Sequence, residues 1–350
     1  MAALTYHEQK DIENIKHLRQ LIKELPPFCS DFFRGIEPQT STRTRIAYAY
    51  DLRIFFDFLR QSNPEVAGMG KNIPLSVLEQ LTVTDLEEYM EYLKCHPSEN
   101  SDDVYNTERG IMRKVSSLKS FYNYFYRNQR IEKNPASLLR LPKLHEKEII
   151  RLEIDEVARL LDQVEDGDKL TDKQKLYHDR TKARDLAMMS LLLGTGIRVS
   201  ECVGLNMTDV DLDACGIRIF RKGGKEAVVY FSDEVRDVLE NYMDERELID
   251  ALPGHEDALF LSLQKKRMSV RSVENLVKKY AQLVTPLKKI TPHKLRSTYG
   301  TSLYRETGDI YLVASVLGHN DVNTTRKHYA AQEDERRRSA RNVVRLRESD

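Results

Sequence analysis

Five short segments in the second half of the chain carry side chains that could act together on a phosphate ester. In chain order they are residues 194–201 (GTGIRVSE), 222–225 (KGGK), 293–296 (HKLR), 317–319 (LGH) and the single residue Tyr329. Arginine offers fork-shaped donors to phosphate oxygens and keeps its charge, while lysine and histidine can move protons. A tyrosine can attack phosphorus once its phenol is deprotonated. Each segment alone is a weak signal, because arginines and tyrosines usually serve packing or solvation.

Taken in this order, the five segments resemble the active-site set of the tyrosine recombinases, especially the Xer-like and integrase branch. The resemblance covers roughly residues 40 to 335. It implies a mainly α fold, with a helical, SAM-like core-binding domain before an α-rich catalytic domain that holds a small antiparallel sheet, the DNA breaking-rejoining enzyme fold. It also implies a site-specific recombinase, which cuts and rejoins DNA through a Holliday junction without ATP.

The resemblance implies roles for the two arginines and the tyrosine. Arg198 and Arg296 match the family's two arginines, which would hold the non-bridging oxygens of the scissile phosphate as negative charge develops there. Tyr329 would attack phosphorus and form a 3′-phosphotyrosyl link. A free phenol has a pKa of ~10, so Tyr329 needs these arginines and a base before it becomes a nucleophile.

The leaving 5′ oxygen must gain a proton. Lys222 matches the family's general-acid lysine, with Lys225 as the second candidate. The alternative interpretation is that both lysines are solvent-exposed residues of a turn without a catalytic role. In many family members the tyrosine follows the Leu-Gly-His histidine by nine residues; here that position holds His328, and Tyr329 comes one later. Either the intervening turn has an extra residue or the nucleophile helix begins in another register.

Two histidines and one acid complete the expected site. His293 lies three residues before Arg296, so a helix would place both side chains on one face, where His293 would hydrogen-bond the phosphate and assist proton transfer. His319 would donate to a non-bridging oxygen. Glu201 resembles the family's acidic residue, which orients the pocket; a simple helix salt bridge with Arg198 explains it nearly as well. The arginines would do the work of a metal ion, so we expect no metal and no cofactor.

The elements that must position these residues follow from apolar periodicity and capping. In the second half we predict helices over residues 154–164, 183–193, 233–248, 270–283, 293–305 and 310–317, with a polar loop after the first. Residues 217–220 and 227–231 read as two strands of a hairpin, because the intervening KGGK turn supplies glycines where a positive φ is wanted.

The first half reads as helical throughout. A leader helix ends at Pro26-Pro27, a second helix begins within residues 40–44, a third is capped at Thr84-Asp85, and a long one spans about residues 107–128. Residues 96–103 read as a loop. We therefore expect a leader (1–38), a helical core-binding domain (39–140), an extended linker (141–150), a catalytic domain (151–333) and a charged tail (334–350).

The local distribution of charged residues supports nucleic-acid binding, although the net charge of the chain does not. Lys plus Arg number 55, as do Asp plus Glu, so the net charge is zero. Basic residues nevertheless far outnumber acidic ones within residues 109–151 and 265–296, as expected of a surface that grips a polyanion. The candidate DNA contacts are Arg109, Arg113, Lys114 and Lys119, on the polar face of the 107–128 helix. Ordinary solvated helix faces are the competing explanation.

Several classes of protein are disfavoured. The longest apolar run is too short to cross a bilayer, and the N-terminus lacks the order of a signal peptide, so we expect a cytoplasmic protein that does not bind a membrane. The four cysteines show no paired spacing, which fits neither a disulfide framework nor a zinc site.

By the same resemblance, the partner is double-stranded DNA at recombination sites, bound by a homodimer on each site and a tetramer in the synapse. Two alternatives stay open: a DNA-binding protein that has lost catalysis on this scaffold, and a type IB topoisomerase. The sequence does not separate chromosome-dimer resolution from integration or excision of a mobile element, nor does it identify the target DNA.

Overall fold

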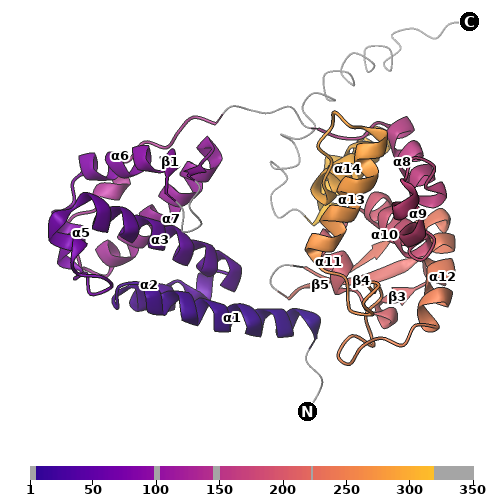
Figure 1. The fold of residues 1–350 in the computed structure, drawn as a ribbon, viewed down its shortest axis with the longest axis horizontal. Helices are drawn as coiled ribbons and strands as arrows, with labels where there is room; N and C mark the ends of the chain where they lie inside the picture. Colours follow the sequence, from indigo (N-terminus) through magenta and orange to yellow (C-terminus); the bar gives the residue numbers. More distant parts are fainter. Residues whose placement is uncertain (1–4, 98–102, 145–149, 222–223, 319–350) are drawn as a thin grey trace, which may run out of the picture. The chain divides into compact units, whose positions relative to one another are not determined.

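The protein is seen here as a computed structural model that describes residues 5–97, 103–144, 150–221 and 224–318. Lys222, His319, His328, Tyr329 and the charged tail of residues 334–350 therefore lie outside the described residues. The chain divides into two compact units, residues 1–147 and 148–350, and the division falls within the stretch predicted as a linker (Figure 1). The fold is mainly helical with small antiparallel sheets, as predicted.

The first unit is built from seven α-helices within the described residues. They are α1 (Tyr6–Glu24), α2 (Cys29–Gly35), α3 (Thr42–Ser62), α4 (Pro64–Ala67), α5 (Ser76–Gln80), α6 (Val83–Tyr92) and α7 (Glu108–Arg127), with 3-10 turns η1 (Glu37–Gln39) and η2 (Pro135–Leu138). The leader helix α1 packs along α3 and places Leu18 and Leu21 in the same core as the α3 and α7 aromatics. Burial of these apolar faces is the main stabilising contribution to the unit.

Capping residues explain most helix boundaries in this unit. Ser41 caps α3 within the predicted stretch, and Thr107 and Asn128 are the two caps of α7, as predicted. The start of α6 was predicted wrongly at Thr84-Asp85. The cap is Thr82, whose side chain accepts from the Asp85 backbone while the Asp85 carboxylate accepts from Thr82 N, so Asp85 is the third residue of the helix rather than its cap.

The prediction of an all-helical first domain was also wrong. Strands β1 (Cys95–His96) and β2 (Val104–Tyr105) form an antiparallel pair at the two ends of the stretch predicted as a loop, and His96 is the one described residue of that stretch that lies in a strand. Two residues per strand are too few for an alternating apolar pattern to be visible in the sequence. A side-chain bond stabilises the base of this pair, since Asn106 Nδ2 donates to the Leu93 carbonyl at 2.7 Å.

The second unit surrounds a central apolar helix. Its elements are α8 (Ile154–Asp166), α9 (Asp172–His178), α10 (Lys182–Thr195), α11 (Val199–Gly204), η3 (Met207–Asp209), β3 (Val210–Asp211), β4 (Gly216–Phe220), β5 (Glu226–Tyr230), α12 (Asp233–Glu247), α13 (Val270–Val284), α14 (Pro292–Thr307) and α15 (Ile310–Leu317). Helix α10 packs against α8, α12 and α14. The six predicted helices are confirmed, with ends within two residues.

Helix α9 stands where a polar loop was predicted. Thr171 and Gln174 form a capping box at its start, but Leu176 and Tyr177 are exposed, so the helix lacks the buried stripe that periodicity detects. The predicted hairpin is confirmed as β4–β5, and a third short strand, β3, extends it into the order β3-β4-β5.

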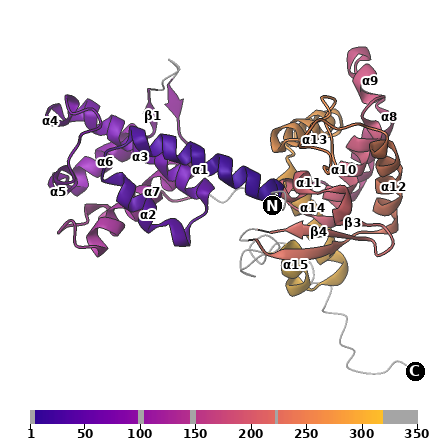
Figure 2. The ribbon, with the colours of Figure 1, turned by 90° about the horizontal axis from the view of Figure 1, so that it is seen from below.

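The hairpin turn is closed by backbone bonds at Arg221. Arg221 N donates to the Lys225 carbonyl at 2.8 Å, and Gly224, at φ +74°, donates to the Arg221 carbonyl at 3.1 Å. Gly224 thus has the positive φ predicted for this turn. Figure 2 shows β4 and α15 on the same side of the unit. No helix among the described residues is long and apolar enough to cross a membrane.

Candidate active site

Arg198 sits at the N-cap of α11, immediately after a left-handed turn. Gly196 ends α10 at φ +63°, and a Cβ at this position would overlap the side chains of Tyr299 and Leu317, so both backbone and space call for glycine. Arg198 N donates to Glu201 Oε2 at 2.8 Å, and Arg198 Nη1 donates to Glu201 Oε1 at 2.8 Å. One carboxylate therefore fixes both the backbone and the side chain of Arg198.

Arg296 reaches the same region from α14. Its side chain is buried, with Arg296 only 6% exposed. Arg296 Nη1 donates to the Gly196 carbonyl at 2.6 Å, and Nη2 donates to the Leu317 carbonyl. The guanidinium thus joins the end of α10 to the end of α15.

The two arginines meet at the C-terminal end of α15. Arg198 Nη2 donates to the Gly318 carbonyl at 3.3 Å, while Arg296 holds the carbonyl of Leu317, the residue before it. The C-terminus of a helix carries partial negative charge and unpaired carbonyls, which stabilise cations there. The fold therefore brings together Arg198 and Arg296, which the sequence had singled out.

Glu201 is the acidic residue of this cluster. Its side chain is 4% exposed, and Arg198 is its ion-pair partner among the described residues. The salt bridge is one of the two roles that the sequence left open for Glu201. Because a buried carboxylate needs compensating donors, Glu201 holds the guanidinium of Arg198 in one orientation.

The expected proton-transfer residues are described only in part. His293 lies in the first turn of α14 and is exposed, whereas Arg296, three residues later, is buried. Lys225 is exposed beside the hairpin turn. Lys222, His319 and Tyr329 lie outside the described residues. Gly318 is the C-cap of α15, so the residue expected to be the second histidine follows directly in the chain.

A different tyrosine packs beside Gly196. Burial raises the pKa of Tyr299, which favours the neutral phenol, the opposite of what a nucleophile needs. Its ring would collide with any Cβ at position 196, which indicates a packing role.

Sequence reasoning missed one arginine at this site. Arg221, the residue between β4 and the KGGK turn, donates from Nη2 to the Val316 carbonyl at 2.8 Å and from Nη1 to the Ser315 carbonyl at 3.4 Å. Its only sequence signal was its place next to Lys222. That signal does not indicate which helix the side chain reaches.

Comparison with known proteins identifies the family. The model named "Phage integrase family" matches residues 151–336. The chain is 33% identical over 332 residues to the tyrosine recombinase XerC of Caldanaerobacter subterraneus subsp. tengcongensis, a match that covers 91% of this chain and 86% of the relative. It is also 33% identical to the tyrosine recombinase XerS of Streptococcus uberis, over 86% of this chain and 90% of the relative. The chain belongs to the phage integrase family. It is a tyrosine recombinase, as the resemblance predicted.

Solved structures of recombinases and integrases have the same fold as this chain. XerH recombinase, in a post-cleavage complex with its palindromic difH substrate, superposes with a TM-score of 0.64 at 18% identity, covering 87% of this chain and 80% of that one. The Tn1549 transposon integrase (aa 82–397), in complex with circular intermediate DNA, gives a TM-score of 0.62 at 20% identity, covering 86% and 94%. At these identities the likeness shows the fold alone.

The basic face predicted on α7 of this recombinase is only partly a solvent-facing surface. Arg113 donates two bonds, of 2.5 and 2.6 Å, to Asp51 on α3, whose side chain is 1% exposed. Lys119 donates to the Leu139 carbonyl at 2.7 Å. Lys114 is 8% exposed and donates to Asn106 Oδ1 at 2.7 Å, so its placement on the exposed face was wrong. Arg109 is exposed.

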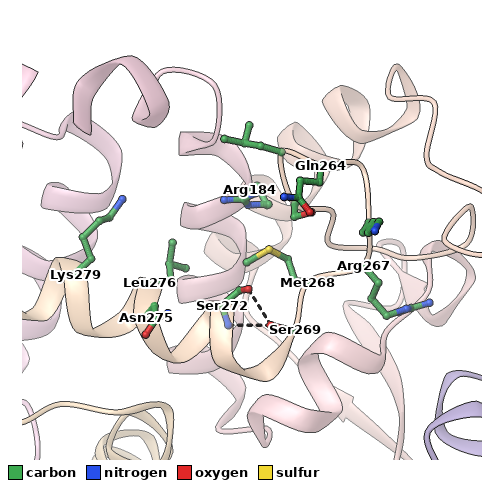
Figure 3. A pocket seen from close by; sticks show the side chains of 12 residues that line it. Arg184, Gln264, Arg267, Met268, Ser269, Ser272, Asn275, Leu276 and Lys279 are labelled. Atoms are coloured by element: carbon green, nitrogen blue, oxygen red, sulfur yellow. Dashed lines mark hydrogen bonds between the residues drawn. The ribbon is translucent and has the colours of Figure 1, made fainter. Parts of the chain in front are cut away.

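The catalytic unit also holds a cavity of about 650 Å³ between α10, residues 262–268 and the start of α13 (Figure 3). Two of its cationic side chains bond within the protein: Arg184 pairs with Asp185 at 2.6 Å, and Arg267 donates to the Leu205 carbonyl at 2.7 Å. No residue among those that line it belongs to the arginine cluster at the end of α15.

Proposed function

We propose that this recombinase breaks DNA by attack of the Tyr329 phenol oxygen on a phosphodiester held by Arg198 and Arg296. One observation carries the proposal. Two guanidinium groups, supplied by separate elements, are held on the consecutive carbonyls of Leu317 and Gly318. Each guanidinium has five N–H donors, and two are engaged at Arg198 by Glu201 and Gly318. Further donors remain at Arg198 for a phosphate oxygen.

The reaction balances without an external energy source. The phenol gives up its proton to a base as its oxygen forms a bond to phosphorus, the bond from phosphorus to the 5′ oxygen breaks, and that oxygen takes up a proton from a general acid, so that protons balance. Attack by the 5′ hydroxyl of a second strand reverses these steps and regenerates the tyrosine. Charge that builds on the non-bridging oxygens in both directions is met by Arg198 and Arg296, which are fixed before substrate binds.

The remaining predicted residues would manage protons around this centre. Lys222 is the proposed donor to the 5′ oxygen, with Lys225 as the second candidate. His293 and His319 would bond the phosphate, and Glu201 would hold Arg198 in place. Exposure of His293 and Lys225 supports these roles, since both side chains are accessible to a polyanion.

The proposed substrate is duplex DNA carrying a recombination site. The related fold is seen bound to DNA in the XerH complex with difH and in the lambda integrase (75–356) dimer on a COC′ core site. We propose the corresponding assembly here, with two protomers on one site and four in a synapse that passes through a Holliday junction. Identification of the bound DNA would show whether the recombinase resolves chromosome dimers or integrates and excises a mobile element.

A nicked suicide substrate tests the proposal. Cleavage next to the nick releases a short fragment, which diffuses away and traps the covalent protein–DNA adduct. Wild-type protein is expected to form the adduct and Tyr329→Phe is not. Tyr311→Phe, which alters an exposed tyrosine on α15, is the matched control and should form it normally. If all three bind DNA and none links, the protein is a binding module that has lost catalysis; relaxation of arbitrary supercoiled DNA by monomers would favour the topoisomerase alternative.

A further inference from the structure

Three arginines, rather than two, hold the last turn of α15. The carbonyls of four consecutive residues accept from them: Ser315 and Val316 from Arg221, Leu317 from Arg296 and Gly318 from Arg198. The final carbonyls of a helix lack their usual partner four residues later, so side-chain donors can replace the missing bonds. The Ser315 carbonyl also accepts from Gly318 N at 3.0 Å. The three cations also lie at the negative end of the helix dipole.

Arg221 also fits closely against the cap of this helix. Gly318 has φ +61°, and a Cβ built on it would overlap the Arg221 guanidinium. The guanidinium therefore lies against the Gly318 backbone, which also supplies the carbonyl that Arg198 binds. Arg221 and Arg198 therefore contact the same residue at the end of α15, Arg221 through its close fit against the backbone and Arg198 through the carbonyl.

The placement of Arg221 has an energetic cost. Its Nε is buried and has no hydrogen-bond partner among the described residues. A buried donor without a partner costs about 1–3 kcal/mol, and more when the group is charged. The bonds that Arg221 donates to the Ser315 and Val316 carbonyls, together with its place at the negative end of the helix, offset this cost.

We propose that Arg221 is a positioning residue for cleavage, which acts through the end of α15 to align Arg198 and Arg296 on the scissile phosphate. The inference rests on the proposed function, because it assumes that these two arginines bind that phosphate. Arg221 itself bonds two carbonyls instead of the substrate. Its backbone closes the β4–β5 turn at Lys225, so it connects the hairpin rigidly to the helix end.

The test compares cleavage of two substrates by the full-length protein. Arg221→Gln removes the positive charge and the guanidinium group that bonds two carbonyls at once. Single-turnover cleavage of an ordinary phosphodiester should then slow about 10- to 100-fold, the effect expected from a small displacement of catalytic groups. A methylphosphonate at the scissile position replaces a charged non-bridging oxygen with a neutral methyl group. Because the methylphosphonate develops less negative charge for Arg198 and Arg296 to stabilise, Arg221→Gln should cleave it at nearly the wild-type rate.

Matched variants separate positioning from general damage. Arg218→Gln removes an arginine from the same strand, where it pairs with Asp209 at 2.9 Å, and should leave the ratio between the two substrates unchanged. Arg221→Lys keeps the charge but reaches one carbonyl at a time, so it should restore part of the rate. Thermal unfolding and DNA affinity, measured on each variant, report folding and binding separately.

The remaining outcomes contradict the inference. Equal loss on both substrates, with a lowered midpoint of unfolding, would mean that Arg221 is only structural. Rescue by a 5′-phosphorothiolate but not by the methylphosphonate would mean that Arg221 serves the leaving-group proton instead. Loss of DNA affinity would make it a DNA contact. If wild type forms no covalent adduct, the proposed function itself fails; if wild type does and Arg221→Gln cleaves normally, only this inference fails.

Discussion

Arg198 and Arg296 donate hydrogen bonds to the carbonyls of two consecutive residues, Gly318 and Leu317, although one arginine caps α11 and the other lies within α14. The last turn of α15 thus sets the separation of the two guanidinium groups. Under the proposed function, this arrangement would offer two positioned guanidinium groups to the negative charge that develops on the phosphate, without reorganising charged side chains during the reaction.

Replacement of either arginine should separate chemistry from binding. Arg198→Ala and Arg296→Ala are each expected to lower single-turnover cleavage by at least about 10²-fold, the cost of removing one preorganised donor to a developing negative charge. Specific DNA affinity should change little, because phosphate contacts elsewhere hold the duplex. Gel-shift titration beside the cleavage assay measures both, with Arg236→Ala on α12 as the control for loss of one positive charge. An equal loss of affinity and cleavage would contradict a catalytic role.

Gly196→Ala should destabilise the catalytic unit more than Gly224→Ala does. Both glycines have positive φ, so both variants incur about 1 kcal/mol of backbone strain. Only at Gly196 would the new Cβ also overlap Tyr299 and Leu317, whereas nothing lies within 4 Å at Gly224. We expect an additional loss of about 1–3 kcal/mol at Gly196 from overpacking. Urea unfolding of the two variants gives the difference, and similar values would show that the space around Gly196 adapts.

Lys222→Ala should slow cleavage because the 5′ oxygen then leaves without a positioned proton donor, an effect of about 10²- to 10⁴-fold for general-acid catalysis. A substrate with sulfur in place of that bridging oxygen needs no proton on leaving and should restore the rate. Lys225→Ala serves as the comparison. If Lys225→Ala shows the loss and the rescue while Lys222→Ala shows neither, the acid is Lys225.

Two arginines on α7 should behave differently. Arg113→Ala leaves the buried Asp51 carboxylate without its ion-pair partner and should cost about 1–3 kcal/mol of stability, less than a fully buried pair because half of Arg113 is exposed. Arg109→Ala should change stability by less than about 0.5 kcal/mol. If Arg109 contacts a phosphate, its loss should reduce the slope of log affinity against log salt by about 1. An unchanged salt slope would remove Arg109 from the DNA interface.

Strong periodicity and capping made much of the fold predictable from sequence. Helix α7 has an apolar stripe and two capping residues, and both of its ends were predicted correctly. Among the elements that were missed, α9 exposes its large apolar residues, and β1 and β2 have two residues each, so they lack such signals. Lys114 was placed on the wrong face because a long side chain can be buried when its ammonium group finds an acceptor, here Asn106.

Among the candidate site residues, Arg198 and Arg296 meet in the described part of the chain, whereas Lys222, His319 and Tyr329 lie outside it. The sequence did not predict the geometry in which the two arginines meet. The order of the motifs singled out Arg198 and Arg296. Their common contact, the carbonyls of Leu317 and Gly318, depends on tertiary packing that the motifs do not encode. Arg221 shows the limit most clearly. Nothing in its neighbouring residues indicates that its side chain reaches Ser315 and Val316, nearly a hundred residues later in the chain.

The most direct measurement of the central claim is the identity of the residue bonded to DNA. After trapping on a suicide substrate, tryptic digestion of the adduct and mass spectrometry locate the linked peptide among the 17 tyrosines of the chain. The account predicts that the linked nucleotide is on the peptide of residues 328–336, in which Tyr329 is the only tyrosine. A link on any other peptide, or DNA cleavage with no protein attached, would contradict it.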